Sequence, residues 1–167
     1  EGLNIQSLLQ LSSLDIQNCK LQALDVTKNL SLKTLICSNN ELTTLDVSNN
    51  TSLVQFYCNN NKLPKINVTA NTALKEFDIS NNLLSALNIR NNTALTYLCV
   101  SNNAELAMVD VKSNTALEVL VASGLAITDI DLAANTALVG ISLVNDNLTS
   151  IVGLLSTVKG VIYIDKT

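Results

Sequence analysis

The sequence of 167 residues contains no histidine and no tryptophan, and aromatic residues make up only 3% of it. Without histidine, a Ser-His or Cys-His nucleophile pair and a histidine-based metal site are excluded, and most hydrolase mechanisms with them. One proline, five glycines and 47% hydrophobic residues indicate an ordered chain with a sizeable core. We therefore expect one folded domain that is not an enzyme and holds no metal or other cofactor.

Basic residues are also scarce. Ten Lys and Arg residues lie singly along the chain against 14 Asp and Glu, which gives a net charge of −4. Proteins that bind nucleic acid or anionic membranes gather basic residues in patches, so neither partner is expected. No run of 18 apolar residues is present, and the opening EGLNIQSLLQ lacks the basic and apolar regions of a signal peptide. We expect no membrane insertion by this chain.

The dominant feature of the sequence is a 21-residue repeat. Its unit is L-x-x-L-x-V-x-x-N-T-x-L-x-x-L-x-C-x-x-N-x, and one additional residue falls between Asn103 and Leu106. Each unit holds two short segments in which apolar and polar residues alternate, such as LDV at 45–47 and FYC at 56–58. This alternation is typical of half-buried strands. No stretch of ten residues is left over for a helix.

One such unit cannot fold alone. Its apolar side chains, about six, stabilise by roughly 1.5–3 kcal/mol each, whereas ordering 21 backbones costs about 20–40 kcal/mol. Neighbouring coils must therefore cover each other and share backbone hydrogen bonds. The repeat predicts a solenoid of about seven stacked coils that is mostly β, with parallel strands and little helix.

An Asn follows each predicted strand. Such an Asn can turn inward and donate and accept at once, satisfying backbone groups of its own coil and the next. The two predicted rows are Asn29, Asn50, Asn71, Asn92, Asn114 and Asn135, and Asn40, Asn61, Asn82 and Asn103. The sequons at Asn49, Asn67, Asn91 and Asn147 also permit glycosylation. Three of the four come with the repeat, so a structural ladder is favoured.

Two segments carry a resemblance to known proteins. LKTLICSNNEL (32–42) and LVQFYCNNNKL (53–63) match L-x-x-L-x-C-x-x-N-x-L, with LDVSxNTxL between them. They resemble the short, Cys-containing leucine-rich repeats of the internalin J type and of Bacteroidetes surface proteins, over about Leu11 to Leu148. The resemblance implies a right-handed leucine-rich-repeat solenoid with the FYC strands on the concave side and the LDV strands on the convex side. It also implies a bacterial surface or secreted binding protein.

The repeat sets the expected domain organisation. Residues 1–167 should form one domain, with an incomplete first coil at 1–20 and an irregular last coil at 149–167 that ends in the strand VIYID. The chain begins inside a coil and is expected to be part of a longer protein. The consensus Cys survives at Cys37 and Cys58, which should face the core as free thiols because adjacent parallel strands fit disulfide geometry poorly. Asp146 should replace the ladder Asn that is lost at Leu125.

Two features of the sequence are compatible with chemical activity, but a plain structural role is favoured for both. Convex acids form a row one coil apart, at Asp25, Asp46, Asp110 and Asp131, with Asn67 and Asn88 between them. Stacked carboxylates can act as an acid–base pair or bind Ca²⁺, but no nucleophile accompanies them, so a solvated row is favoured. Cys99 occupies an outward concave position, where we expect an ordinary exposed thiol because no His or Lys lies beside it.

The outward residues of the concave strands carry the predicted binding surface. Its candidates are Tyr57, Glu76, Asp78, Tyr97, Cys99, Val119 and Val121. Aromatic and aliphatic groups exposed beside acids are typical of protein-binding surfaces, although such residues also favour strands. Binding of a protein partner is the leading hypothesis. The alternatives are a glycan-binding module, disfavoured by only three Tyr and no Trp, and a structural spacer that displays another domain.

Overall fold

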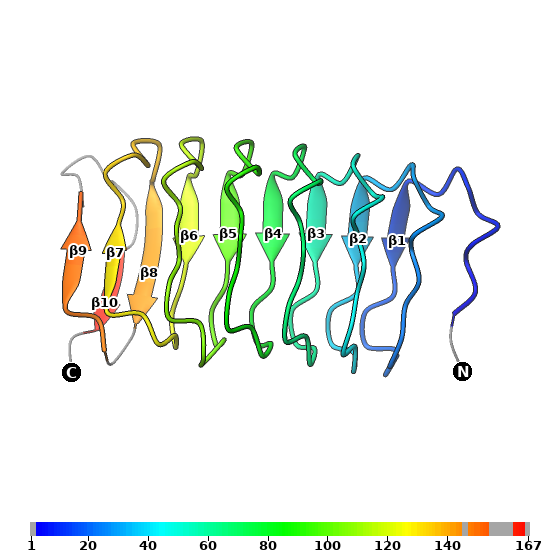
Figure 1. Ribbon diagram of the computed structural model, residues 1–167, viewed down its shortest axis with the longest axis horizontal. Coiled ribbons are helices and arrows are strands. Elements are labelled where there is room, and N and C mark those ends of the chain that lie inside the picture. The colour runs from blue at the N-terminus through cyan, green and yellow to red at the C-terminus, as the bar shows by residue number, and fades with distance from the viewer. Residues whose placement is uncertain (1–2, 145–146, 154–161, 166–167) are drawn as a thin grey trace.

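The computed structural model describes residues 3–144, 147–153 and 162–165. The chain winds in stacked coils from one end of the molecule to the other (Figure 1). The described residues contain no helix, and none of them forms a helical span that could cross a membrane. The strands are β1 (Ser13–Asp15), β2 (Thr34–Ile36), β3 (Gln55–Tyr57), β4 (Glu76–Asp78), β5 (Tyr97–Cys99), β6 (Val119–Val121), β7 (Asp129–Asp131), β8 (Gly140–Val144), β9 (Ser150–Val152) and β10 (Ile162–Asp165). The predicted solenoid is confirmed.

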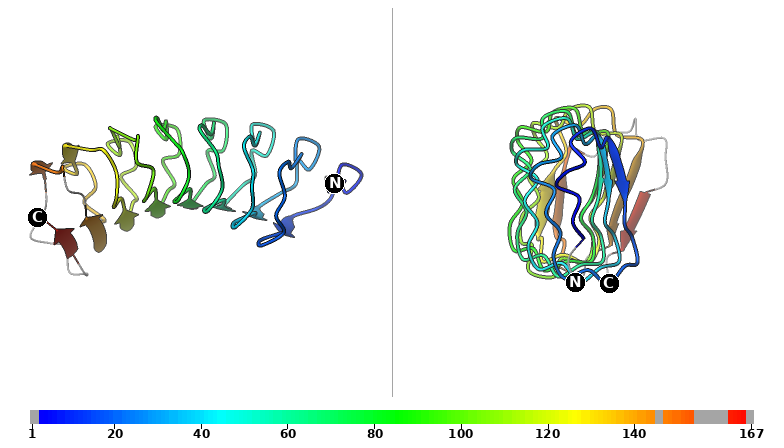
Figure 2. Two further views of the ribbon diagram at one scale, coloured as in Figure 1. Left: turned by 90° about the horizontal axis from the view of Figure 1, so that it is seen from below. Right: turned by 90° about the vertical axis from the view of Figure 1, so that its right-hand side faces the viewer.

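One parallel sheet runs the length of the molecule in the order β1-β2-β3-β4-β5-β6-β8-β10. Its register follows the repeat, so that Phe56 lies opposite Phe77 and Leu98 lies opposite Leu120. Seen from below in Figure 2, the strands line the inner side of a shallow arc. The segments of the FYC type therefore form the concave face, as the resemblance implied.

The convex side differs from the prediction of a strand in every coil. Among the described residues only β7 and β9 pair there as strands, and Leu3 and Leu24 form an isolated bridge. The other LDV segments of the described residues do not pair as strands. The curvature explains this, because coils that are one strand spacing apart on the inner side of an arc lie farther apart on its outer side, beyond hydrogen-bond reach.

Stacked rows of apolar side chains fill the space between the two sides. Phe56 and Phe77 lie with ring centroids 5.3 Å apart and planes 10° from parallel, an arrangement in which each ring covers its neighbour. Cys37 and Cys58 are fully buried and unbonded, as expected, and Ile79 continues their row. Burial raises the pKa of Cys37 to about 12. These thiols therefore serve as small apolar groups.

The first row of buried Asn residues lies next to the convex segments and only donates. Asn71 Nδ2 donates to Val47 O at 2.9 Å and to Asn50 O at 2.8 Å, both in the preceding coil. The corresponding oxygens have no hydrogen-bond partner, namely Oδ1 of Asn29, Asn50, Asn71, Asn92, Asn114 and Asn135. The prediction that these amides donate and accept at once is wrong for this row. Their Nδ2 atoms hold the coils together while Oδ1 faces no donor.

The second row lies after the concave strands and uses both ends of the amide. Asn61 Nδ2 donates to Cys37 O and Cys58 O, both at 3.1 Å, while its Oδ1 accepts from Leu42 N at 3.0 Å. The same pattern recurs at Asn82. Asp146, the predicted replacement in the last coil, lies outside the described residues.

The residue before each of these amides has a left-handed backbone. Asn39, Asn60, Asn81 and Asn102 have φ between 52° and 56°, and the equivalent Asn18 and Gly124, which precede Cys19 and Leu125, have φ of 60° and 64°. Asn tolerates this region better than other residues with a Cβ, and Gly adopts it freely. The recurring Asn-Asn pair therefore combines a turn former with a buried amide. The repeat predicted a role for the second member alone.

Candidate protein-binding surface

The predicted binding residues lie on the concave face of four adjacent strands. In β3 the buried Phe56 separates the outward Gln55 and Tyr57. Strand pairing places Tyr57 in one row with Asp78, Cys99 and Val121. It places Gln55 in a second row with Glu76, Tyr97 and Val119. The register thus brings together all seven candidates within three strand spacings, about 15 Å. All except Cys99 are half-buried.

Glu76 lies at the centre of a chain of hydrogen bonds across β2, β3 and β4. The Tyr57 hydroxyl donates to Glu76 Oε2, and Gln55 Nε2 donates to Glu76 Oε1 at 3.2 Å. Thr34 Oγ1 donates to Gln55 Oε1 at 3.1 Å. Burial, and secondarily the bond to Glu76, raises the pKa of Tyr57 to about 12. The tyrosine is therefore a neutral donor that fixes the carboxylate in place.

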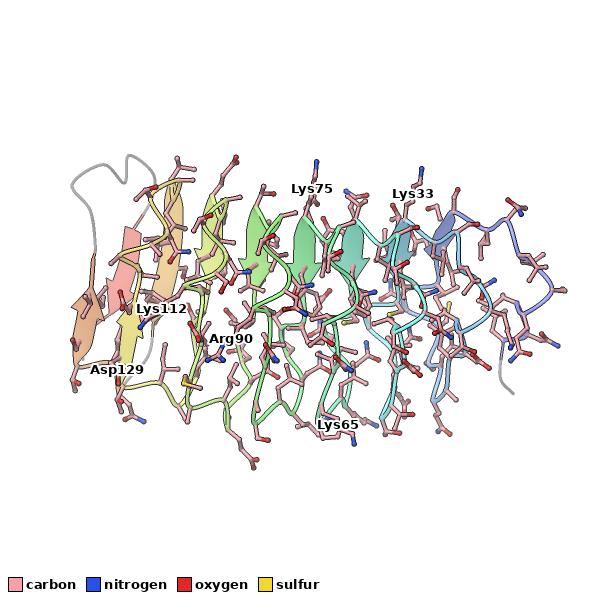
Figure 3. The ribbon with its side chains drawn as sticks, turned by 45° about the horizontal axis from the view of Figure 1, so that its top comes forward. Lys33, Lys65, Lys75, Arg90, Lys112 and Asp129 are labelled. Carbon is pink, nitrogen blue, oxygen red and sulfur yellow. The ribbon has the colours of Figure 1, made fainter. Side chains whose placement is uncertain are left out.

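Asp78 supplies a second fixed carboxylate on the same surface. Its Oδ1 accepts from Ser80 N at 2.9 Å and from Ser80 Oγ at 2.6 Å. Neither Asp78 nor Glu76 forms an ion pair with any residue that the structure describes. Lys33 and Lys75, which directly precede β2 and β4, project from the edge of the sheet (Figure 3). The concave face between Tyr57 and Tyr97 is therefore negatively charged.

The prediction that Cys99 is an exposed thiol is wrong. It points outward, since its neighbour Leu98 lies in the core, yet it is only 7% exposed. Burial, and then the neighbouring Cys99, raises the pKa of Tyr97, and Ser80 and Ser101 act on the pKa of Cys99, so these three side chains lie beside the thiol. Burial, and then the charge of Asp78, raises the pKa of Cys99. A small side chain between larger ones on a concave surface is covered by its neighbours, so this thiol is protected.

The convex acids have a turn-forming role in the structure. Asp46 Oδ1 accepts from Ser48 N at 2.9 Å, and Asn67 Oδ1 accepts from Thr69 N at 3.1 Å, two residues ahead in each case. Such bonds stabilise the turn that ends each convex segment. They also lower the pKa of Asp46, with the largest effect from the Ser48 side chain. The described residues contain no group of three metal-ligating side chains.

Comparison with known proteins relates this geometry to solved structures of other proteins. No family model and no curated protein matches the chain. The functional domain of InlJ from Listeria monocytogenes, described as including a cysteine ladder, is 31% identical, with a TM-score of 0.69 over 92% of this chain and 38% of that one. The chain is a leucine-rich-repeat protein that resembles the internalins. In this internalin-like chain only Cys37 and Cys58 occupy the stacked core position, and Ile79 follows them in the next coil.

Two further structures share the fold. A leucine-rich-repeat protein of Leptospira interrogans is 21% identical, with a TM-score of 0.86 over 98% of this chain and 44% of that one. An internalin (inlF) of Listeria monocytogenes is 20% identical, with a TM-score of 0.76 over 98% and 51%. The internalin-like chain thus spans between 38% and 51% of the length of these three structures.

Proposed function

We propose that this chain is a non-enzymatic recognition module that binds a protein partner through its concave sheet. The observation that carries the proposal is the cluster on β3 to β6, where Tyr57 and Tyr97 flank two carboxylates that have no basic partner among the described residues. Aromatic anchors of this kind dominate the energetics of protein interfaces. The likeness to internalins supports the proposal and favours a bacterial surface or secreted protein.

The roles within the cluster follow from its geometry. Tyr57, Tyr97 and Val121 offer half-buried apolar area that a partner can cover completely. Glu76 and Asp78 are held by hydrogen bonds before any partner arrives, so little side-chain entropy remains to be lost. Uncompensated carboxylates select a basic feature on the partner and repel an acidic one. The small serines that follow the strands contribute shape rather than affinity.

The test is capture of a partner by the immobilised chain and by two matched double variants. We expect Tyr57→Ala with Tyr97→Ala to abolish capture of the protein that the parent retains from a cell-surface protein fraction. Both rings lie outside the apolar core, so the fold should persist. The convex control, Asp110→Asn with Asp131→Asn, should capture as the parent does. Normal capture by the tyrosine variant together with loss in the convex variant would contradict the proposal.

The other two candidate functions predict different outcomes. A glycan-binding module would retain defined sugars on a glycan array and lose them when Glu76 and Asp78 become amides, although the chain offers only three tyrosines and no tryptophan for stacking. A structural spacer would capture neither protein nor sugar. Comparing the array with the protein capture separates these two candidates from protein recognition.

A further inference from the structure

A second surface feature lies on the opposite side of the solenoid. A groove of about 530 Å³ opens on the convex face, across three successive coils. Its floor includes Leu45 and Ile66, and its walls include Asp25, Asp46 and Lys65, together with threonine hydroxyls. A volume of this size lies in the range of ligand sites. The concave sheet contributes none of the lining residues.

The groove exists because the convex segments are not paired. No backbone hydrogen bond joins the amides of residues 43–47 to another coil, in contrast to β7 and β9 farther along the described chain. Leu45 and Ile66 are half-buried, whereas Val47 and Val68, two residues farther on, are completely buried. The spread coils therefore leave aliphatic surface accessible between them.

The charges along the convex row differ between its two halves. In the later coils Arg90 pairs with Asp110 at 3.0 Å, and Lys112 pairs with Asp131 at 3.1 Å. Arg90 lies two residues after the turn-forming Asn88, and Lys112 lies two residues after the turn-forming Asp110. Each cation therefore pairs with the acid of the next coil. Figure 3 shows Arg90 and Lys112 on this face. In this half the chain neutralises its own acids.

The groove lies in the half where the same position is neutral. For Asp46 this position is Thr27, whose hydroxyl donates instead to Asp25. For Asp25 it is Gln6, whose amide donates to the second carboxylate oxygen. Neither acid forms an ion pair with a described residue, and Lys28 acts on Asp25 only at longer range. Two neighbouring carboxylates thus border an apolar floor, and neither forms an ion pair with a described residue.

We propose that this groove binds an extended segment of a partner protein in which an aliphatic side chain lies next to a basic one. The aliphatic group would cover Leu45 and Ile66, and the basic group would lie between Asp25 and Asp46, where it relieves the repulsion between two like charges. Lys65 also lines the groove, and Figure 3 shows it below the level of Arg90. Because it is positively charged, it disfavours a second basic residue of the partner beside it. The proposal is independent of the concave surface.

The experiment uses the full chain and a defined probe. Because the chain has no tryptophan, the fluorescence of the peptide acetyl-Lys-Leu-Trp-Leu-Ser-amide reports binding without background. We expect Asp25→Asn with Asp46→Asn to weaken binding of this peptide about fivefold, since exposed charge pairs contribute modestly. The same peptide with Glu in place of Lys should bind more weakly to the parent. Added salt should reduce the difference between the two peptides.

Matched variants separate charge in the groove from charge in general. Asp110→Asn with Asp131→Asn removes the same charge from the paired half and should change affinity less than about twofold. Lys65→Gln should strengthen binding of the basic peptide. The fold tolerates amides at these positions, because Asn67 and Asn88 stand at the equivalent positions of other coils. Each accepts from the backbone N–H two residues ahead, at 3.1 Å and 3.2 Å. Circular dichroism of each variant checks this.

Several outcomes would overturn the proposal. Equal binding of the two peptides would assign the groove to a neutral ligand such as a glycan. Equal weakening in both double variants would mean that the net charge of the protein drives binding. Loss of binding in Tyr57→Ala with Tyr97→Ala would move the peptide to the concave face. A dimer that dissociates in Asp25→Asn with Asp46→Asn would assign the groove to a second copy of the chain.

Discussion

Replacement of Asn71 by Ala tests how the buried amides hold neighbouring coils together. The side chain is completely buried, and its two hydrogen bonds reach Val47 O and Asn50 O. Each of these oxygens keeps one backbone donor, Asn50 N for the first and Leu53 N for the second, both at 3.0 Å. The substitution therefore weakens two acceptors and leaves neither without a partner. We expect a loss of about 2 kcal/mol, within the range for buried hydrogen-bonding groups.

Two further variants give the expected order of effects. Among the described residues Asn61 supplies the only acceptor of Leu42 N, a buried donor, so Asn61→Ala should cost about 1 kcal/mol more than Asn71→Ala. Asn49 is exposed and makes a single bond of 3.2 Å to Thr27 O. Its replacement should cost less than about 0.5 kcal/mol. The structure thus ranks Asn61 above Asn71 and both above Asn49.

Thermal unfolding followed by circular dichroism and calorimetry measures this order. For a chain of this length, 1 kcal/mol shifts the Tm by about 2–4 °C, so Asn71→Ala should melt about 4–8 °C below the parent. Agreement between the calorimetric and van't Hoff enthalpies would justify converting these shifts into free energies. If all three variants melt together with the parent, the buried amides do not stabilise the stack and the reasoning is refuted.

Three other predictions concern ionisable groups. In thiol labelling, Cys19 should react fast while Cys37, Cys58 and Cys99 react slowly, and Tyr97→Ala should accelerate Cys99 alone; fast labelling of Cys58 would mean that the strand faces are reversed. Hydrogen bonds hold the pKa values of Asp46 and Asp110 below the usual value, so the ionised carboxylates stabilise the fold above about pH 4. This stabilisation is lost as the pH falls through the lowered pKa values. The Tm should therefore drop in acid, and it should drop less in Asp46→Asn with Asp110→Asn. Glu76→Gln should lower the pKa of Tyr57 from about 12 towards the usual 10, measured by tyrosinate absorbance against Tyr57→Phe; an unchanged value would rule out the bond to Glu76 as a cause.

The repeat made the register of the concave sheet predictable. Once the period is 21, Phe56 must lie opposite Phe77, and alternation then decides which side chains point outward. The position of the buried Asn rows followed in the same way. Whether Asn71 Oδ1 finds a donor did not, because this depends on the path of the turn in three dimensions.

The features that the sequence left open all depend on curvature and on neighbouring side chains. Alternation shows that Cys99 points outward, but only the structure shows that its neighbours bury it. The convex groove at Leu45 depends on the distance between neighbouring coils on the convex side, and the sequence repeat does not predict this distance. The left-handed Asn60 had a signal in the sequence, the recurring Asn-Asn pair, since Asn is enriched where φ is positive.

The most direct test of concave recognition observes the two tyrosines themselves. The chain has only three tyrosines, so selective ¹³C labelling gives a simple aromatic spectrum that Tyr57→Phe and Tyr97→Phe assign. With a captured partner at saturation, we expect the ring resonances of Tyr57 and Tyr97 to shift, because a partner on the concave sheet covers both rings. Ring resonances of both residues that stay unchanged under a saturating partner would contradict the central claim.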